Sequence, residues 1–480
     1  MFGMDTTFAD FKDEVTEEVA VVNKPQSGSA WGSAVGGICL LALALALMRL
    51  SIPNGVTCET VSITGPDGKP CLGTVWKPPS PKAVMLIGHG VTSNQGIMAN
   101  TAKAFAANGY TAVTLDFWGH GRSEERFDWR SNKDQLKAWF AWAHTLGNLP
   151  VAYMGHSMGG FCGAETLIED PSGISAFVAL GALPPQFPAC KTAVAAGHFE
   201  ELFSEAEARA KTGDKAEVIF SPFSDHSLEP FDPVLLGRIV AWVDGALGLP
   251  GSAQFPWSCW VCALLGTVIG CVAAFRLAGL AAGMMSQKAY SAPVRLATRR
   301  WSLNPYRLAG WMLRCKGAPE TPRSGSLFSA FDQGVFFAVV LAGVLSFVLD
   351  RDMFTSGLWH SDRLGVWCIL APILLLPFLA GASALERVGP DSVFKRFAVS
   401  ALTRCTPLLL LSAALYLLDS RLAFGCMILC IWAFIFAMLS VAHAVVTQRT
   451  GDYRAGATAS AVTLAWVIAY WMPLSWPWIR

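Results

Sequence analysis

A series of apolar stretches, each about 20 residues long, constrains the architecture of this chain more than any other feature. Stretches of this length can cross a lipid bilayer as helices. The first covers residues 30–50. Six more are expected at 256–276, 327–349, 364–385, 398–418, 422–446 and 457–477. The chain is 53% hydrophobic and 15% charged, whereas soluble domains have about 25% charged residues. The sequence therefore predicts a multi-pass membrane protein.

The charges next to these stretches suggest an orientation. The segment between the second and third stretches is rich in arginine and lysine, and such loops stay in the cytoplasm. Seven crossings then leave the N-terminus in the cytoplasm and residues 55–250 outside it. An acidic tail, residues 1–29, precedes the first stretch. A cleaved signal peptide usually has a basic start and a small-residue cleavage site, so a retained anchor in a cell (inner) membrane is favoured.

Residues 55–250 differ from the rest because they read as an ordinary soluble domain. Short apolar runs such as 83–87, 111–115 and 151–154 predict buried strands, and they alternate with segments that predict helices, among them 200–211 and 233–247. Strands alternating with helices indicate a mostly parallel sheet covered on both faces. Four units are therefore expected. They are a cytoplasmic tail (1–29), an anchor (30–50), an α/β domain (55–250) and an all-α domain of six membrane helices (256–480).

The sequence Gly155-His156-Ser157-Met158-Gly159-Gly160 carries the clearest chemical signal. It stands between a predicted strand, 151–154, and a predicted helix, 161–168. A serine flanked by glycines on such a turn is the pattern of a nucleophile elbow, in which a tight turn exposes the serine hydroxyl. The glycines leave room for the backbone in that turn.

Three motifs in order, His89-Gly90, Asp116-x-x-Gly-x-Gly-x-Ser123 and the serine turn, each follow a predicted strand. This arrangement resembles the α/β-hydrolase superfamily, in its serine esterase, lipase and peptidase branch, over about residues 55–250. The resemblance implies a serine, acid and histidine triad in chain order. Ser157 matches the nucleophile, and His226 matches the base after the last strand. Glu200 stands where the acid is expected, although aspartate is commoner there and Glu201 adjoins it. The alternative interpretation of Glu200 is a solvated glutamate at a helix start, which the helix dipole favours.

The resemblance also suggests the surroundings of Ser157. The backbone amides of Val91 and Met158 are expected to form the oxyanion hole. Only about a dozen residues separate the predicted strands 176–180 and 192–196, so no lid domain is expected and the site should be open. Side chains expected near this edge of the sheet could line an acyl pocket, although ordinary loop packing explains some of them equally well. They are His89, Phe117, Trp118, His156, Phe187 and Phe199.

The leading hypothesis is a membrane-anchored serine hydrolase that cleaves a carboxylic ester through an acyl-enzyme. An acyltransferase or a peptidase would use the same three residues. A transporter-like protein with an accessory hydrolase-like domain is an alternative from another class, and a non-catalytic relative is a third. The expected partners are an acyl-bearing substrate and the lipid bilayer. Gly266-x-x-x-Gly270 in the second stretch is typical of helix packing, which leaves homo-oligomerisation open.

Other partner classes find little support in the composition. The net charge of +1 does not suggest binding to nucleic acid. The thirteen cysteines show no paired metal-binding spacing, so neither a metal nor another cofactor is expected, and no disulfide is assigned.

Overall fold

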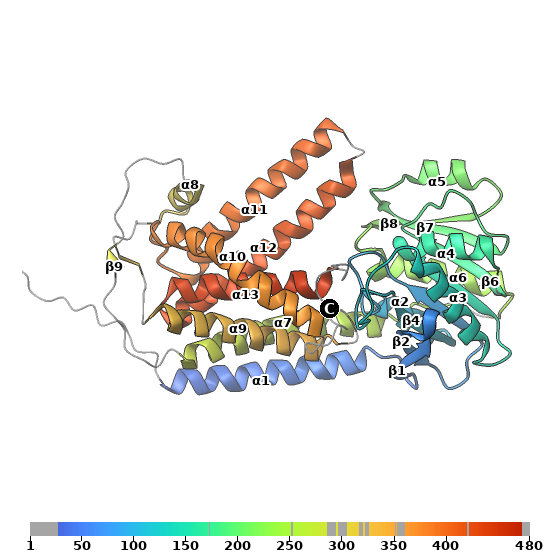
Figure 1. Cartoon of the computed structure of the whole chain (residues 1–480), viewed down its shortest axis with the longest axis horizontal. Coiled ribbons are helices and arrows are strands. Elements are labelled where there is room, and N and C mark those ends of the chain that lie inside the picture. The colour runs from blue at the N-terminus through green and yellow to red at the C-terminus, as the bar shows by residue number, and fades with distance from the viewer. Residues whose placement is uncertain are drawn as a thin grey trace, which may run out of the picture.

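The computed structural model shows two units, a sheet-containing domain and a bundle of long helices (Figure 1). The structure describes residues 27–171, 173–250, 253–285, 294–295, 305–315, 320–321, 326–350, 352, 361–419 and 422–472. Side chains are described from residue 32 onward. Nearly all of the expected acidic tail, 1–29, therefore lies outside the described residues.

The first unit is built on an eight-stranded sheet with the order β1-β2-β4-β3-β5-β6-β7-β8. The strands are β1 Thr57–Thr64, β2 Pro70–Lys77, β3 Ala83–Gly88, β4 Tyr110–Asp116, β5 Val151–His156, β6 Ile174–Leu180, β7 Lys191–Phe199 and β8 Glu217–Asp225. β2 is antiparallel to β1 and β4, and all strands from β4 to β8 in the sheet order are parallel. This is the mostly parallel sheet that the alternation of strands and helices predicts.

Helices cover both faces of the sheet. They are α2 Ala99–Ala107, α3 Ser131–His144, α4 Met158–Glu169, α5 Glu205–Thr212 and α6 Pro233–Leu247. Neighbouring residues of a strand point to opposite faces. On β3, Met85 packs in a core with residues of α2 and α6, whereas Leu86 packs in a second core with residues of α3 and α4. Because both faces are buried, the central strands are apolar along their whole length.

One predicted helix, residues 200–211, begins later than expected. The helix α5 starts at Glu205, after an N-cap at Ser204. The Ser204 side chain accepts from the backbone N–H of Glu207, and Glu207 accepts from the backbone N–H of Ser204. This capping box fixes the first turn. Glu200 consequently lies in the loop before the helix, and the alternative interpretation of Glu200 as a solvated glutamate at a helix start is wrong.

The second unit consists of long helices. They are α1 Ser27–Leu50, α7 Trp257–Met285, α9 Leu327–Val348, α10 Ser361–Glu386, α11 Val393–Leu418, α12 Ala423–Thr450 and α13 Tyr453–Trp471. All but α13 are long and apolar enough to cross a membrane, which gives six candidate spans among the described residues. These six helices are consistent with a multi-pass membrane protein.

The seventh expected span, 457–477, corresponds to α13, which is not among the candidates by hydropathy. The helix begins at Tyr453, earlier than expected, and residues after 472 lie outside the described part. Nearly all of its residues are buried, because it packs against α9, α10 and α12. A helix surrounded by other helices needs small side chains more than a lipid-facing apolar surface. Its Thr458, Ser460 and Thr463 lower its hydropathy without exposing polar groups to lipid.

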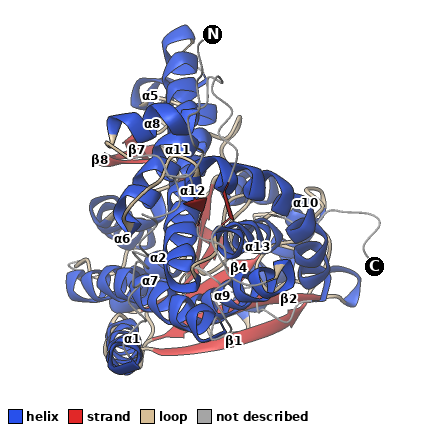
Figure 2. Ribbon diagram, turned by 90° about the vertical axis from the view of Figure 1, so that its left-hand side faces the viewer, coloured by secondary structure: helices blue, strands red, loops and turns tan. Residues whose placement is uncertain are grey.

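The small-residue pairs of α7 pack within the chain. A Cβ at Gly266 would lie 2.7 Å from the Met48 sulfur of α1, and one at Gly270 would lie 2.7 Å from Val348 of α9. Close approach of helices through glycine is common in membrane bundles. This face of α7 is therefore used inside the bundle, as the end-on view in Figure 2 illustrates for α1, α7 and α9.

Contacts at one end of the bundle join it to the sheet-containing unit (Figure 1). The buried Arg363 of α10 donates to the carbonyl oxygen of Gly119, in the loop after β4, and to three carbonyl oxygens at the end of α13. Arg122, from the same loop, pairs with Asp350 at 2.9 Å. Buried Lys103 of α2 pairs with Asp352. The carboxyl end of the parallel sheet thus faces the helix bundle.

Candidate active site

Ser157 occupies a strained turn between β5 and α4. Its φ is 50° and its ψ is −115°, a conformation that L-residues rarely adopt and that costs about 1–3 kcal/mol. A Cβ at Gly155 would lie 2.2 Å from the carbonyl group of Gly159, so that position requires glycine. The backbone N–H of Ser157 donates to Leu180 at the end of β6. The turn therefore has the strand, glycines and strained serine that the elbow pattern predicts.

His226 and Glu200 come together where β7 and β8 end. The register between the two strands shifts after Gly197, whose Cβ, if present, would lie 1.9 Å from the Ser224 carbonyl oxygen. This close approach brings the two following loops together. The His226 Nδ1 atom lies 2.9 Å from Glu200 Oε2 and 3.1 Å from Glu200 Oε1. Both side chains are buried.

The His226 ring also stands next to the serine turn. It lies 4.8 Å, centroid to centroid, from the ring of His156, the residue before Ser157. The Nε2–H of His156 donates to the His226 carbonyl oxygen at 3.0 Å. Leu180, which accepts from the backbone N–H of Ser157, is followed by Gly181. A Cβ at Gly181 would lie 3.0 Å from His226 Nδ1. The structure thus brings the elbow and the His226–Glu200 pair to one edge of the sheet.

The electrostatic surroundings keep Glu200 ionised. Burial opposes the charge, but the hydrogen bond and the positive potential of His226, together with the Leu202 N–H, hold the pKa of Glu200 below its usual value. A carboxylate facing Nδ1 favours the tautomer with the proton on Nδ1, which leaves Nε2 free to accept a proton. The pair can therefore act as a general base towards a neighbouring hydroxyl.

Glu229, a residue that the sequence analysis did not single out, lies behind this pair. It belongs to the short 3₁₀ helix η2 (Glu229–Phe231) and is fully buried. Its Oε1 accepts from the Gly197 N–H at 2.9 Å, and its Oε2 lies 3.6 Å from His156 Nε2. Burial, and then the negative charge of Glu200, raises the pKa of Glu229 well above its usual range. The raised pKa favours the protonated carboxyl, and its Oε2 has no hydrogen-bond partner among the described residues. Its position only three residues after His226 is the one signal in the sequence that could have drawn attention to it.

We expect Glu229→Gln to retain activity within about threefold, because an amide replaces a protonated carboxyl as donor and acceptor. Glu229→Ala should instead lose roughly 1–3 kcal/mol of stability, since it leaves the Gly197 N–H buried without its acceptor. The measurement is kcat/KM against pH, together with thermal unfolding. An ionised Glu229 would give a different result. Removing a negative charge near His226 would then shift the acid limb of the profile to lower pH by roughly one unit.

Glu201, the neighbour of Glu200, contacts the backbone of His226 instead of its ring, and its pKa is raised instead of lowered. Its Oε2 accepts from the backbone N–H of His226 at 3.1 Å. Burial raises the pKa of Glu201 to about 7, and the nearby charges of Asp225 and Glu200 act in the same direction. Glu201 therefore helps to place the histidine loop, although it does not face the imidazole.

The raised pKa of Glu201 predicts a pH effect on stability. Between the ordinary glutamate value of 4.5 and about 7, the folded state holds a proton that the unfolded state has lost. Stability therefore falls as pH rises through this window. Glu201→Gln should remove this loss and stabilise the protein at pH 8, but not at pH 4, by about 1 kcal/mol, given partial solvent screening. Thermal midpoints at both pH values test this, with exposed Glu59→Gln as control. Equal shifts for both variants would contradict it.

The loop after β3 passes directly against the serine turn. A Cβ at Gly90 would lie 3.2 Å from the Ser157 Cβ and 3.1 Å from His156 Nδ1, so a larger residue there would crowd the serine turn. The next residue is Val91. Met158 is the first residue of α4, and the N–H of a residue at this position has no acceptor inside the helix. Buried Asp116 accepts from two nitrogens of Gln95 and from the Arg122 N–H, which ties this loop to the loop after β4.

The other side chains expected near the site occupy different places. His89 is buried, donates from Nδ1 to the Gly90 carbonyl oxygen and accepts at Nε2 from the Phe117 N–H. Burial lowers its pKa to about 4, so it is neutral. Phe117 and Trp118 pack in the core beside α3. Phe187 packs against a small cluster around Phe203, and Phe199 is 61% exposed.

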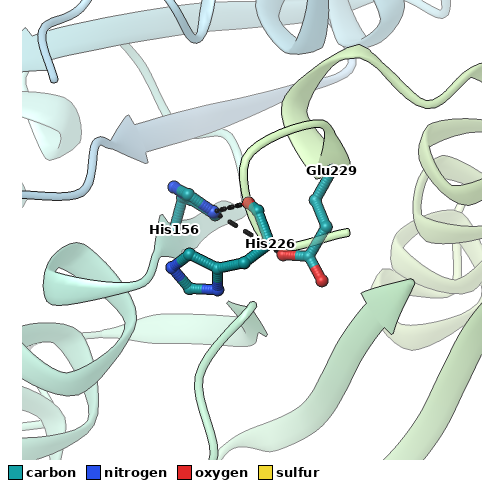
Figure 3. Close-up of side chains that lie close together, drawn as sticks. All are labelled: His156, His226 and Glu229. Atoms are coloured by element: carbon teal, nitrogen blue, oxygen red, sulfur yellow. Dashed lines mark hydrogen bonds and ion pairs between the residues drawn. The ribbon is translucent and has the colours of Figure 1, made fainter. Parts of the chain in front are cut away.

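His156, His226 and Glu229 form a group that could hold a metal ion, because one ligand atom from each lies within 4.8 Å of the others (Figure 3). Their hydrogen bonds favour a different interpretation. The His226 Nδ1 faces Glu200, and the His156 Nε2 donates to a carbonyl oxygen. Since the structure already gives these three residues hydrogen-bond partners, the group is better described as a hydrogen-bonded network behind the elbow.

The site is partly covered, although the sequence predicts an open site without a lid. The connection between β6 and β7 is short and contains no inserted domain, as the sequence predicts. However, the ring of Phe424 in α12 lies 5.4 Å from the His226 ring, and Met427 Sδ lies 2.9 Å from Ser227 Oγ. The N-terminal end of α12 therefore covers the histidine side of the site.

Comparison with known proteins gives one family match. Residues 79–212 match the family described as serine aminopeptidase, S33, and these residues include Ser157 and Glu200. No curated protein matches the chain.

Similar solved structures include an esterase from Pyrococcus furiosus, with 16% identity over 40% of this chain and 94% of that one and a TM-score of 0.35. A dienelactone hydrolase from Anabaena variabilis has 20% identity over 40% and 97%, with a TM-score of 0.34. A serine hydrolase without a lid from Xanthomonas campestris has 17% identity over 42% and 98%, with a TM-score of 0.34.

Proposed function

We propose that this protein is a membrane-anchored serine hydrolase that cleaves a carboxylic ester, because the segment from β1 to α6 has an α/β-hydrolase fold and residues 79–212 match a serine aminopeptidase family. Ser157 is the nucleophile, His226 the base and Glu200 the acid. The observation that carries the proposal is the hydrogen bond of 2.9 Å between His226 and Glu200 beside a strained serine turn. Six helices that are apolar enough to cross a membrane support the anchoring.

The mechanism follows from the positions of these groups. His226 Nε2 takes the proton of the Ser157 hydroxyl while the serine oxygen attacks the acyl carbonyl carbon. The carbonyl oxygen gains negative charge, and the N–H groups of Val91 and Met158 stabilise it. The histidinium then gives its proton to the departing alkoxide, which leaves an acyl-serine. Water, activated by the same histidine, releases the acid and restores the serine.

Acyl transfer to an alcohol and peptide cleavage would use the same residues, and they remain alternatives within this class. A transporter-like function for the bundle has less support. Its buried polar cluster, in which Glu386 pairs with Arg396 at 2.6 Å beside His443, joins the end of α10 to the start of α11. It therefore lies near the bundle end remote from the sheet, where it can hold helices together, whereas transported substrates bind near mid-membrane.

A fluorophosphonate probe tests the proposal, because it reacts with an activated serine. Membranes that contain the wild-type protein should be labelled at Ser157, and Ser157→Ala should abolish the label. Ser123→Ala, which changes a buried serine outside the elbow, is the matched control and should leave the label unchanged. Equal labelling of the wild type and Ser157→Ala would sink the proposal.

We further place the hydrolase domain outside the cytoplasm, in a cell (inner) membrane with the N-terminus inside. The support is the position of α8 (Pro305–Met312), in the arginine-rich segment, at the bundle end away from the hydrolase domain (Figure 1). Such segments stay in the cytoplasm. Protease added to sealed right-side-out vesicles should digest residues 55–250. Digestion from the cytoplasmic face alone would reverse this orientation.

A further inference from the structure

An apolar cavity of about 540 Å³ lies between the hydrolase domain and α7. On the hydrolase side it is lined by the loop that carries His226, and on the other side by the first three turns of α7. The residues that matter are Phe223, Leu228 and Phe231 on one side and Trp260, Ala263 and Leu264 on the other. A volume of this size is in the range of small-molecule sites, about 300–1,000 Å³.

Two chain segments connect the cavity wall to the candidate catalytic groups. Leu228, in the wall, follows His226 by two residues in the same loop. Asn100, at the start of α2, also lines the cavity, and α2 directly follows the loop that carries Val91. The indole of Trp260 donates to the Phe231 carbonyl oxygen at 2.9 Å, which fixes this wall against the loop.

The cavity also extends along a candidate membrane span. Trp257 begins α7, and Thr267, the farthest lining residue, lies ten residues later, about 15 Å along the helix. That distance is about half the hydrocarbon thickness of a bilayer. On this helix, Trp257 and Leu264 are about half exposed; across the cavity, Phe223 of β8 is 68% exposed. Large apolar side chains so exposed on a membrane span are suited to contact with hydrocarbon rather than water.

We propose that this cavity binds the acyl chain of a bilayer lipid and that such a lipid ester is the substrate of Ser157. The role of the lipid as a substrate rests on the proposed hydrolase function. The binding of the acyl chain in the cavity does not depend on it. The reactive carbonyl would lie beside His226, while the chain extends along α7 into the membrane. The bilayer is the source of the ligand because the cavity wall is itself a membrane span.

Two measurements on the full-length protein test the proposal separately. In the first, Ser157→Ala is placed in phosphatidylcholine vesicles that contain a lipid with a photoreactive diazirine in its acyl chain. We expect cross-links within residues 223–231 and 257–267. Adding Ala263→Phe fills the cavity and should reduce these cross-links at least tenfold. Val261→Phe, on the same helix but not part of the cavity wall, should not. Cross-links that Ala263→Phe leaves unchanged would overturn the binding site.

The second measurement is hydrolysis of a four-carbon and a sixteen-carbon aryl ester. Ala263→Phe should lower kcat/KM for the long ester at least tenfold and change that for the short ester less than twofold. An equal effect on both esters would show that the bound lipid is structural, which overturns its role as substrate. Specific cross-linking without hydrolysis of either ester would contradict the proposed function and leave the binding site intact.

Discussion

Ser157→Ala is expected to lower kcat for ester hydrolysis about 10⁶-fold, because the nucleophile and the base act as one unit. KM should change little, since the hydroxyl contributes to bond formation more than to binding. The substitution also relieves no strain, because alanine at φ 50° is as disfavoured as serine. The free energy of unfolding should therefore stay within about 0.5 kcal/mol of the wild-type value.

The experiment measures hydrolysis of a short aryl ester by purified full-length protein in detergent. Ser227→Ala is a useful control, because Ser227 adjoins the base but contacts Met427 instead of the substrate side. It should retain activity within a few-fold. Retention of more than about 1% of the wild-type kcat by Ser157→Ala would exclude Ser157 as the nucleophile.

Glu200→Gln is expected to lower kcat about 10⁴-fold. An amide can donate to His226 Nδ1, which would stabilise the tautomer with its proton on Nε2. That tautomer cannot accept the serine proton. The amide also lacks the negative charge that stabilises the imidazolium. Proton transfer from Ser157 to His226 and then from His226 to the leaving group should therefore both slow down.

Glu201→Gln supplies a matched control on the adjacent residue. Its carboxylate accepts from the His226 backbone N–H and does not contact the ring, so the amide should preserve that bond and cost less than tenfold in kcat. The pattern of losses identifies the acid. A 10⁴-fold loss in Glu201→Gln or Glu229→Gln, with Glu200→Gln active, would assign the acid to another glutamate.

Much of the hydrolase fold could be predicted because its signals are local. The elbow needs glycines next to Ser157, and the apolar runs that form β3, β4 and β5 are contiguous in the chain. Helix α6 was predicted with its observed bounds, since Asp232 caps it and Pro233 begins it. The start of α5 was missed because the capping box at Ser204 determines it more strongly than the preceding apolar pattern.

The membrane domain shows the limit of hydropathy. α13, the described part of the seventh expected span, is largely enclosed by other helices and is not among the candidate spans of the described residues. Whether a helix faces lipid or other helices depends on its neighbours, which hydropathy does not report. The same holds for the cover that Phe424 provides over His226, because nothing near either residue in the sequence indicates their contact.

The sequence by itself determined the parallel sheet, the strained turn at Ser157 and the division into a sheet-containing domain and a region of long apolar helices. Each depends on residues close together in the chain, on strand and helix periodicity or on glycine at a tight turn. Only the tertiary structure decided which of three nearby glutamates meets the His226 ring and which is fully buried with a raised pKa. It alone showed that the sheet edge carrying Ser157 faces the long apolar helices, because Gly119 and Arg363 meet only when both units are folded.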